Sequence, residues 1–207
     1  MGIMRRKRTA VLISGRGSNL SALIAAASAP EFPAEIALVL SNREDAAGLA
    51  IAQKAGIATR TISHRNFDSR EAFDRAIDAA LREAKIDLVC EAGFMRIHSD
   101  WFPKAWEGKL LNIHPSLLPA FKGIHVQQQA IDAGVKISGC TVHFIVPELD
   151  SGPIIAQAAV PVLPNDTADT LAARILVEEH ALYPAALRLV AEGKVRLEGG
   201  RAVFAAA

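Results

Sequence analysis

An asparagine and a histidine stand two residues apart at the end of an apolar run, in the segment LLNIHPSLLPAFKG of residues 110–123. Side chains alternate along a β-strand, so Asn112 and His114 are expected on one face of the strand. Pro115 has no N–H group to donate to a sheet, and the strand should end there. Two polar side chains at a strand end, followed by a loop, are typical of an α/β active site; a strand that simply runs out at a proline is the alternative.

Further ionisable side chains lie near the ends of the later strands, among them His125, His143 and Asp150. An asparagine can donate a hydrogen bond to an oxyanion, while histidine and aspartate can move protons. A carboxylate near an imidazole would also favour the protonated ring. The chain has no G-x-S-x-G elbow, no cysteine beside a plausible base and no zinc-like histidine spacing. We therefore expect direct attack of one substrate on another, without a covalent enzyme intermediate or a metal.

A glycine-rich turn, SGRGSNL at residues 14–20, joins the first expected strand to the first helix. Backbone N–H groups in such a turn, together with the helix N-terminus, can bind an anion. Leu20 stands where a dinucleotide fingerprint has its third glycine, and the second strand ends in Ser41-Asn42-Arg43 without an acid for a ribose. The turn therefore favours a single phosphate group over NAD; a purely structural tight turn is the alternative.

Strand-length apolar runs alternate with segments of helical period, which predicts an α/β fold with a mostly parallel, doubly wound sheet. The expected strands cover residues 9–14, 35–41, 58–63, 86–93, 109–116, 137–146 and 153–162. The last two are separated by a short loop and predict an antiparallel hairpin. One helix is expected to start at Ser18, a second to end at Gly56, and a third, after the strand 109–116, to end at Gly134. The clearest amphipathic helix covers residues 68–85, where Phe73, Ile77 and Leu81 form an apolar stripe. A long final helix should begin near Asp166 as N-cap and break or kink near Pro184.

The composition limits the function classes. The chain has 207 residues, enough for one domain, with 51% hydrophobic residues and a net charge of +1. The near-neutral charge argues against nucleic-acid or membrane-surface partners. No apolar run is long enough to span a bilayer, and a cytoplasmic location is the default expectation. The basic run from Arg5 to Arg8 is expected to be a solvated start, and Cys90 and Cys140 to be reduced core residues.

Four motifs in order resemble those of the folate-dependent glycinamide ribonucleotide formyltransferases: SGRGSNL (14–20), GFMRI (93–97), NIHPSLLPAFKG (112–123) and LDSGP (149–153). The resemblance extends over nearly the whole chain, to EEHALYP at residues 178–184. It implies a single formyltransferase domain, with a phosphate- and nucleotide-binding half over about residues 1–105 and a folate-binding, catalytic half over about residues 106–207. It also implies attack of the amine of glycinamide ribonucleotide on the formyl carbon of 10-formyltetrahydrofolate, in purine biosynthesis.

The same resemblance implies roles for particular residues. Asn112, His114 and Asp150 would be catalytic, and Gly17, Ser18 and Asn19 would bind the ribonucleotide phosphate. Glu179 resembles the acid that holds the ribose. His98 stands where a small apolar residue is commoner in relatives. The implied folate contacts are Arg70, Met95, Arg96, Ile97, His98 and Asn112. The implied partners are small molecules, with the protein a monomer or homodimer.

Three other functions are alternatives to glycinamide ribonucleotide formyl transfer. A formyltransferase acting on initiator methionyl-tRNA would carry a further nucleic-acid-binding domain and more basic charge. A 10-formyltetrahydrofolate hydrolase would have a regulatory domain before the first strand and a second histidine where Pro115 stands. A non-catalytic nucleotide-sensing domain would be favoured by loss of the asparagine, histidine or aspartate, and all three are present.

Overall fold

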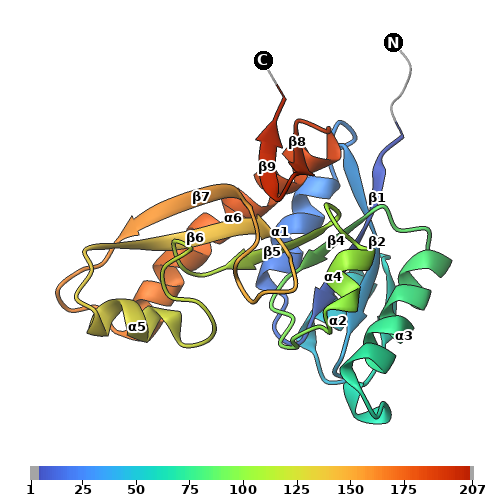
Figure 1. The fold of residues 1–207 in the computed structure, drawn as a ribbon, viewed down its shortest axis with the longest axis horizontal. Helices are drawn as coiled ribbons and strands as arrows, with labels where there is room; N and C mark the ends of the chain where they lie inside the picture. Colours follow the sequence, from blue (N-terminus) through green and yellow to red (C-terminus); the bar gives the residue numbers. More distant parts are fainter. Residues whose placement is uncertain (1–4, 206–207) are drawn as a thin grey trace.

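The computed structural model describes residues 5–205, drawn in Figure 1. Seven strands form one sheet: β1 (Lys7–Ile13), β2 (Ala34–Ser41), β3 (Ala58–Thr61), β4 (Leu88–Glu91), β5 (Leu110–His114), β6 (Ile137–Phe144) and β7 (Ile154–Pro161). A separate hairpin contains β8 (Val195–Glu198) and β9 (Arg201–Phe204). The helices are α1 (Ser18–Ala27), α2 (Ala47–Lys54), the 3₁₀ turn η1 (His64–Asn66), α3 (Arg70–Glu83), α4 (Trp101–Ala105), α5 (Val126–Asp132) and α6 (Ala168–Ala191).

The sheet confirms the expected α/β fold. Its strand order is β3-β2-β1-β4-β5-β6-β7, and the five strands from β3 to β5 are parallel. β6 pairs antiparallel with both β5 and β7, which confirms the predicted hairpin. Figure 1 shows this hairpin extending away from the parallel strands, with α5 beside its far part. The chain order reverses between β1 and β4, which creates the crevice where open α/β sheets bind ligands.

Helices cover both faces of the sheet, and each face has its own hydrophobic core. Side chains of α1 and α6 pack with alternate residues of β1, β4 and β5, such as Val11, Cys90 and Leu111. Side chains of α3 and α4 pack with the intervening strand residues. The predicted stripe of Phe73, Ile77 and Leu81 on α3 is buried there. The alternation of side chains along each strand divides the two cores.

A buried tyrosine connects the last long helix to the centre of the sheet. Tyr183 on α6 is fully buried, and its hydroxyl group lies 2.8 Å from the carbonyl oxygen of Glu91 and 3.1 Å from that of Leu111. These carbonyls belong to β4 and β5, the strands that end at the crevice. The Tyr183 hydroxyl group thus connects α6, by a shared hydrogen bond, to the two strands that end at the crevice.

The final helix differs from the sequence-based prediction at two points. Its N-cap is Thr167, which forms a capping box with Thr170; Asp166 instead pairs with Arg174 at 2.7 Å. The helix also continues past Pro184, so the predicted break is wrong, while a kink there stays a prediction. Proline removes one helical hydrogen bond, but the following residues pack in the core against the sheet, and this packing retains the helix.

The structure also corrects the N-terminal prediction and adds elements that were not expected. Lys7 and Arg8 already belong to β1, and Arg5 pairs with Asp87 at 2.6 Å, so the basic run is not simply a solvated start. α4 and the β8–β9 hairpin were not predicted. Cys90 and Cys140 are free and buried as expected. Within residues 5–205, the structure contains no helix long and apolar enough to cross a membrane.

Replacing Tyr183 with phenylalanine should lower the free energy of unfolding by about 1 kcal/mol, because the two strand carbonyls lose their shared donor while the ring still fills the core. Urea denaturation of the wild-type and Y183F proteins measures the difference. An unchanged unfolding midpoint would show that the hydroxyl tether contributes no stability.

Candidate active site

The candidate residues gather at the carboxyl-terminal edge of the parallel strands. The turn of residues 14–17 follows β1, the loop that begins at Ala92 follows β4, and Asn112 and His114 end β5. Parallel strands have their carboxyl ends at one edge of the sheet, so these segments meet beside the strand-order reversal. The predicted end of β5 before Pro115 is confirmed.

The glycine-rich turn is shaped by close packing against α2. Gly17 has a φ of 79° and precedes the first residue of α1. A Cβ atom at Gly17 would lie 2.7 Å from the Cα atom of Gly48, whereas one at Gly15 would meet nothing within 4 Å. The turn therefore packs tightly against α2 at Gly17, whereas the space beside Gly15 is free of other atoms. Its backbone N–H groups and the N-terminus of α1 can receive an anion.

Asn112 and His143 face each other across neighbouring strands, where they are register partners on β5 and β6. His143 Nδ1 lies 2.9 Å from the carbonyl oxygen of Phe144 and donates to it, which leaves Nε2 as an acceptor. The Asn112 amide nitrogen lies 3.3 Å from that Nε2 atom. Burial lowers the pKa of His143, which favours the neutral ring. His143 therefore orients the Asn112 amide, a contact that the sequence motif did not reveal.

His114 is buried and lies close to Asp150. Its Nε2 atom lies 2.9 Å from the carbonyl oxygen of Phe121, and its Nδ1 atom lies 3.6 Å from Asp150 Oδ2. The side chains of His114 and Asp150 are 6% and 8% exposed. The Nε2 atom thus donates to a backbone carbonyl, and the Nδ1 atom is directed toward the Asp150 carboxylate.

The loop that carries Asp150 is held against the end of β6. Asp150 has a φ of 48°, and its Oδ2 atom accepts a hydrogen bond of 2.8 Å from the N–H group of Gly123. A Cβ atom at Gly152 would lie 1.6 Å from the carbonyl oxygen of Phe144, so only glycine fits there. This close approach explains the glycine of the LDSGP motif and directs the Asp150 carboxylate toward His114.

A second buried carboxylate lies beside the glycine-rich turn. Glu179 on α6 accepts a hydrogen bond of 2.7 Å from the Asn19 amide nitrogen. Burial raises the pKa of Glu179, although the Asn19 contact opposes this effect. Asn19 Oδ1 is buried and has no hydrogen-bond partner among the described residues. The pair can therefore accept hydrogen bonds from a hydroxyl-bearing ligand next to the anion site.

The loop between β4 and α4 presents three of the predicted folate contacts to solvent. Met95 and Ile97 are 66% and 55% exposed, and Arg96 is also exposed. Arg70 is exposed at the start of α3. The His98 side chain, in contrast, is only 5% exposed and lies between Asp74 and Glu91. The structure thus separates His98 from the exposed members of the predicted set.

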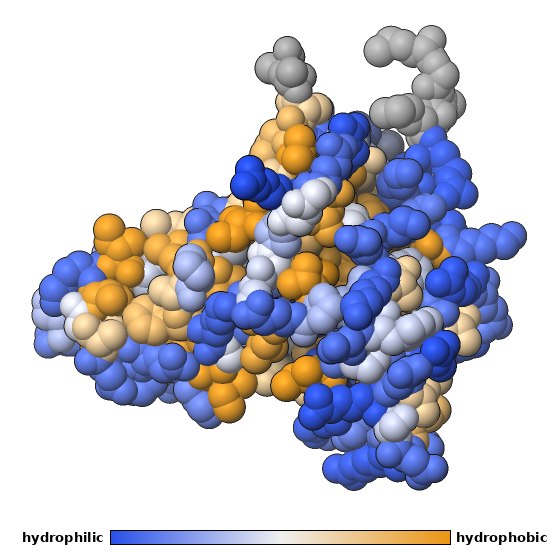
Figure 2. Space-filling view, in the orientation of Figure 1, coloured by the Kyte–Doolittle hydropathy of each residue, from blue (hydrophilic) through white to orange (hydrophobic). Residues whose placement is uncertain are grey.

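Two hollows differ in their position relative to these residues. One of about 610 Å³ lies beside Asp150 and Lys122, and it is also lined by Gly200 in the turn of the C-terminal hairpin and by Arg201 at the start of β9. Figure 2 shows hydrophobic patches over β6 and β7 and also around the C-terminal hairpin, interspersed with hydrophilic residues.

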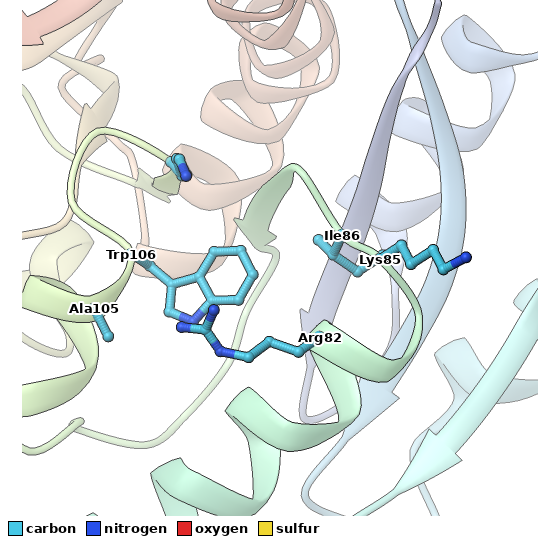
Figure 3. A pocket seen from close by; sticks show the side chains of 6 residues that line it. Arg82, Lys85, Ile86, Ala105 and Trp106 are labelled. Carbon is cyan, nitrogen blue, oxygen red and sulfur yellow. The ribbon is translucent and has the colours of Figure 1, made fainter.

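The other hollow, of about 320 Å³, is shown in Figure 3 and is lined by Arg82, Lys85, Ile86, Ala105, Trp106 and Lys109. Ile86 and Lys109 precede β4 and β5, so this hollow lies at the opposite edge of the sheet. The Arg82 guanidinium pairs with Asp78 at 2.8 Å and lies 5.7 Å from the centroid of the Trp106 ring. This hollow is therefore not part of the candidate site.

Residues 7–187 match the model of the formyl transferase family. The chain is 46% identical over 187 residues to phosphoribosylglycinamide formyltransferase of Escherichia coli (strain K12), covering 90% of this chain and 88% of that protein. It is 54% identical over 198 residues to the trifunctional purine biosynthetic protein adenosine-3 of Bos taurus. That match covers 95% of this chain but 20% of the relative, so the chain spans about a fifth of the length of the trifunctional protein.

A solved structure with similar architecture is glycinamide ribonucleotide transformylase 1 from Symbiobacterium toebii. It matches with a TM-score of 0.94 and 47% sequence identity, covering 97% of this chain and 95% of that chain. The overall architecture is therefore shared over nearly the whole of both chains.

Replacing Glu179 with glutamine should stabilise the fold at about pH 8, because a buried carboxylate that must ionise becomes a neutral amide. The folded-state pKa of Glu179 is raised, so wild-type stability falls as the pH rises from the ordinary glutamate pKa through the folded-state value. At about pH 3, below the ordinary glutamate pKa, the acid is protonated in both states, and the difference should nearly vanish. Urea denaturation at the two pH values measures the difference in free energy of unfolding between the wild type and the variant. An equal difference at both pH values would contradict the role of Glu179 ionisation.

Proposed function

The chain belongs to the formyl transferase family, and from this premise we propose that it transfers the formyl group of 10-formyltetrahydrofolate to the amine of phosphoribosylglycinamide. The reaction serves purine biosynthesis. The observation that carries the proposal is the pairing of His114 with Asp150 at 3.6 Å, beside Asn112 and at the same sheet edge as the glycine-rich turn. An amide, an imidazole and a carboxylate beside an anion site match the needs of a phosphorylated amine acceptor.

The proposed step is direct attack. The amine nitrogen of the ribonucleotide forms a bond to the formyl carbon, and the carbonyl oxygen becomes an oxyanion. The attacking amine loses a proton, N10 of the folate gains one, and the bond between N10 and the formyl carbon breaks. No side chain forms a bond to the formyl group in this sequence of steps.

Asn112 and His114 are the proposed donors to the oxyanion. One Asn112 N–H group is turned to His143, which leaves the second available. His114 donates from Nε2 to the Phe121 carbonyl, whereas its Nδ1 atom lies 3.6 Å from Asp150 Oδ2, beyond hydrogen-bond distance, so an N–H group on Nδ1 is available to the oxyanion. Prearranged donors stabilise a developing charge without reorganising during the reaction.

Asp150 has two proposed roles. Its carboxylate holds a negative charge beside the Nδ1 atom of His114 and, directly or through a water molecule, accepts the proton that the amine loses. The hydrogen bond from the Gly123 N–H group and the packing of Gly152 keep the carboxylate in place. Both contacts are made by backbone atoms, so the carboxylate position does not depend on a mobile side chain.

Substrate binding is divided between the two sides of the crevice. The turn at Gly17, Ser18 and Asn19 would bind the phosphate, and Glu179 with the unpartnered Asn19 Oδ1 atom would accept hydrogen bonds from ribose hydroxyls. The exposed apolar side chains of Met95 and Ile97 suit a flat pteridine ring. Arg70 and Arg96 are exposed cations available to the folate carboxylates.

A direct assay distinguishes this activity from hydrolysis. The absorbance of the folate is followed after mixing protein, 10-formyltetrahydrofolate and ribonucleotide, and again with each substrate omitted. We expect turnover only with both substrates. Turnover without the ribonucleotide would indicate a hydrolase, and absence of turnover under all conditions would favour a binding domain.

Replacing Asp150 with asparagine should lower kcat on the order of a hundredfold or more while both substrates still bind, because the proton acceptor and the charge beside His114 are lost. The asparagine oxygen can still accept from the Gly123 N–H group. Glu148→Gln is a matched control in the same loop, since the Glu148 side chain is 80% exposed. Loss of binding with an unchanged kcat would reassign Asp150 to substrate binding.

A further inference from the structure

The loop between β4 and α4 exposes its side chains but has a tightly held backbone. At its beginning, Ser14 donates its N–H group to the carbonyl oxygen of Gly93 at 3.1 Å. The Ser14 hydroxyl group in turn accepts a hydrogen bond of 2.8 Å from the N–H group of Met95. Three exposed residues, Met95–Ile97, follow this attachment to the end of β1.

At its other end, the loop enters a buried cluster of charged groups. His98 Nδ1 lies 2.7 Å from Asp74 Oδ1 on α3, and His98 Nε2 lies 2.5 Å from Glu91 Oε1 at the end of β4. Asp74 Oδ2 accepts two further hydrogen bonds, of 2.6 Å from the N–H group of Ser99 and 2.7 Å from its hydroxyl group. The side chains of Asp74, His98 and Glu91 are 1%, 5% and 8% exposed.

Aromatic rings enclose the imidazole of His98. Phe94 and Phe102 stack against it at centroid distances of 5.5 Å and 4.3 Å. Burial lowers the pKa of His98, but the charges and hydrogen bonds of Glu91 and Asp74 outweigh this effect and raise the pKa to about 9. At neutral pH, His98 is therefore an imidazolium that donates one N–H group to each carboxylate.

This cluster connects three separate elements. Asp74 belongs to α3, Glu91 to β4, and His98 and Ser99 to the loop itself. A buried charge that loses its partner is costly, so the three side chains have few alternative arrangements. The segment Met95–Ile97 is thus fixed at both ends, by Ser14 before it and by His98 and Ser99 after it.

We propose that His98 is a positioning residue: held between Asp74 and Glu91, it fixes the loop so that Met95, Arg96 and Ile97 present a preformed surface to the pteridine of the formyl donor. This inference rests on the proposed function. It assigns His98 no direct contact with the folate. Fixing the loop during folding avoids the ordering cost that a mobile loop would incur on binding.

The central experiment compares His98→Leu with the wild type. We expect KM for 10-formyltetrahydrofolate to rise about tenfold, while KM for the ribonucleotide and kcat at saturating folate change less than about twofold. Hydrogen exchange of the Met95–Ile97 amides should become faster in the variant. An unchanged folate KM in a folded variant, or equal losses in both KM values and kcat, would overturn the proposal.

A milder variant and a control complete the test. Ser99→Ala removes only the hydroxyl donor to Asp74 and should raise the folate KM by less than His98→Leu does. This variant tests the positioning role if His98→Leu does not fold. Asp166→Asn weakens a different ion pair, with Arg174, and should affect stability without changing the folate KM. An unaltered folate KM in Ser99→Ala, or an equal rise in Asp166→Asn, would contradict the positioning role.

The two proposals fail in different ways. If the wild-type protein shows no transfer that depends on the ribonucleotide, the proposed function is wrong. Amide exchange at Met95–Ile97 in His98→Leu still measures whether the buried cluster fixes the loop. A wild-type exchange rate in that variant would overturn the positioning role independently of catalysis.

Discussion

Parallel pairing of β1 with β4, and of β4 with β5, is the constraint on which the candidate site depends. The pairing brings three strand ends to one edge, although the strands are separated by many residues in the chain. Each strand end then contributes a different chemical group: backbone N–H groups after β1, the buried Glu91 on β4, and an amide with an imidazole on β5. Tyr183 secures the arrangement from α6 by bonding to backbone carbonyls of β4 and β5.

Two buried carboxylates at this edge, Glu179 and Asp150, are the groups to which we assign functional roles in our proposal. Glu179 and Asp150 are mostly removed from water, and each is held by very few donors. Such groups oppose folding unless they are paired, and they remain responsive to ligands because their pairing is incomplete. The cluster of Asp74, His98 and Glu91 differs, because each His98 nitrogen has a carboxylate partner, and we assign it to loop positioning.

Much of the fold could be predicted because local patterns and tertiary packing agree. The stripe of Phe73, Ile77 and Leu81 predicted an amphipathic helix, and α3 buries that stripe. Pro115 ended a strand as expected. Pro184 did not end a helix, because core packing around Tyr183 and Leu187 outweighs the lost hydrogen bond. The hairpin β8–β9 was missed although Gly199 and Gly200 both adopt positive φ, as a two-residue hairpin turn requires.

The sequence by itself determined the alternation of strands and helices, the glycine-rich turn, and the presence of Asn112 and His114 on one strand, because these follow from side-chain periodicity and local backbone preferences. The resemblance implied that Asp150 and His114 act together, and the structure places them 3.6 Å apart. Only the tertiary structure decided the contacts of Glu179 with Asn19 and of His143 with Asn112. It also decided that His98 is enclosed rather than exposed. Its two partners come from α3 and β4, and neither a spacing nor a motif encodes contacts formed by the register of a sheet and the packing of a helix on it.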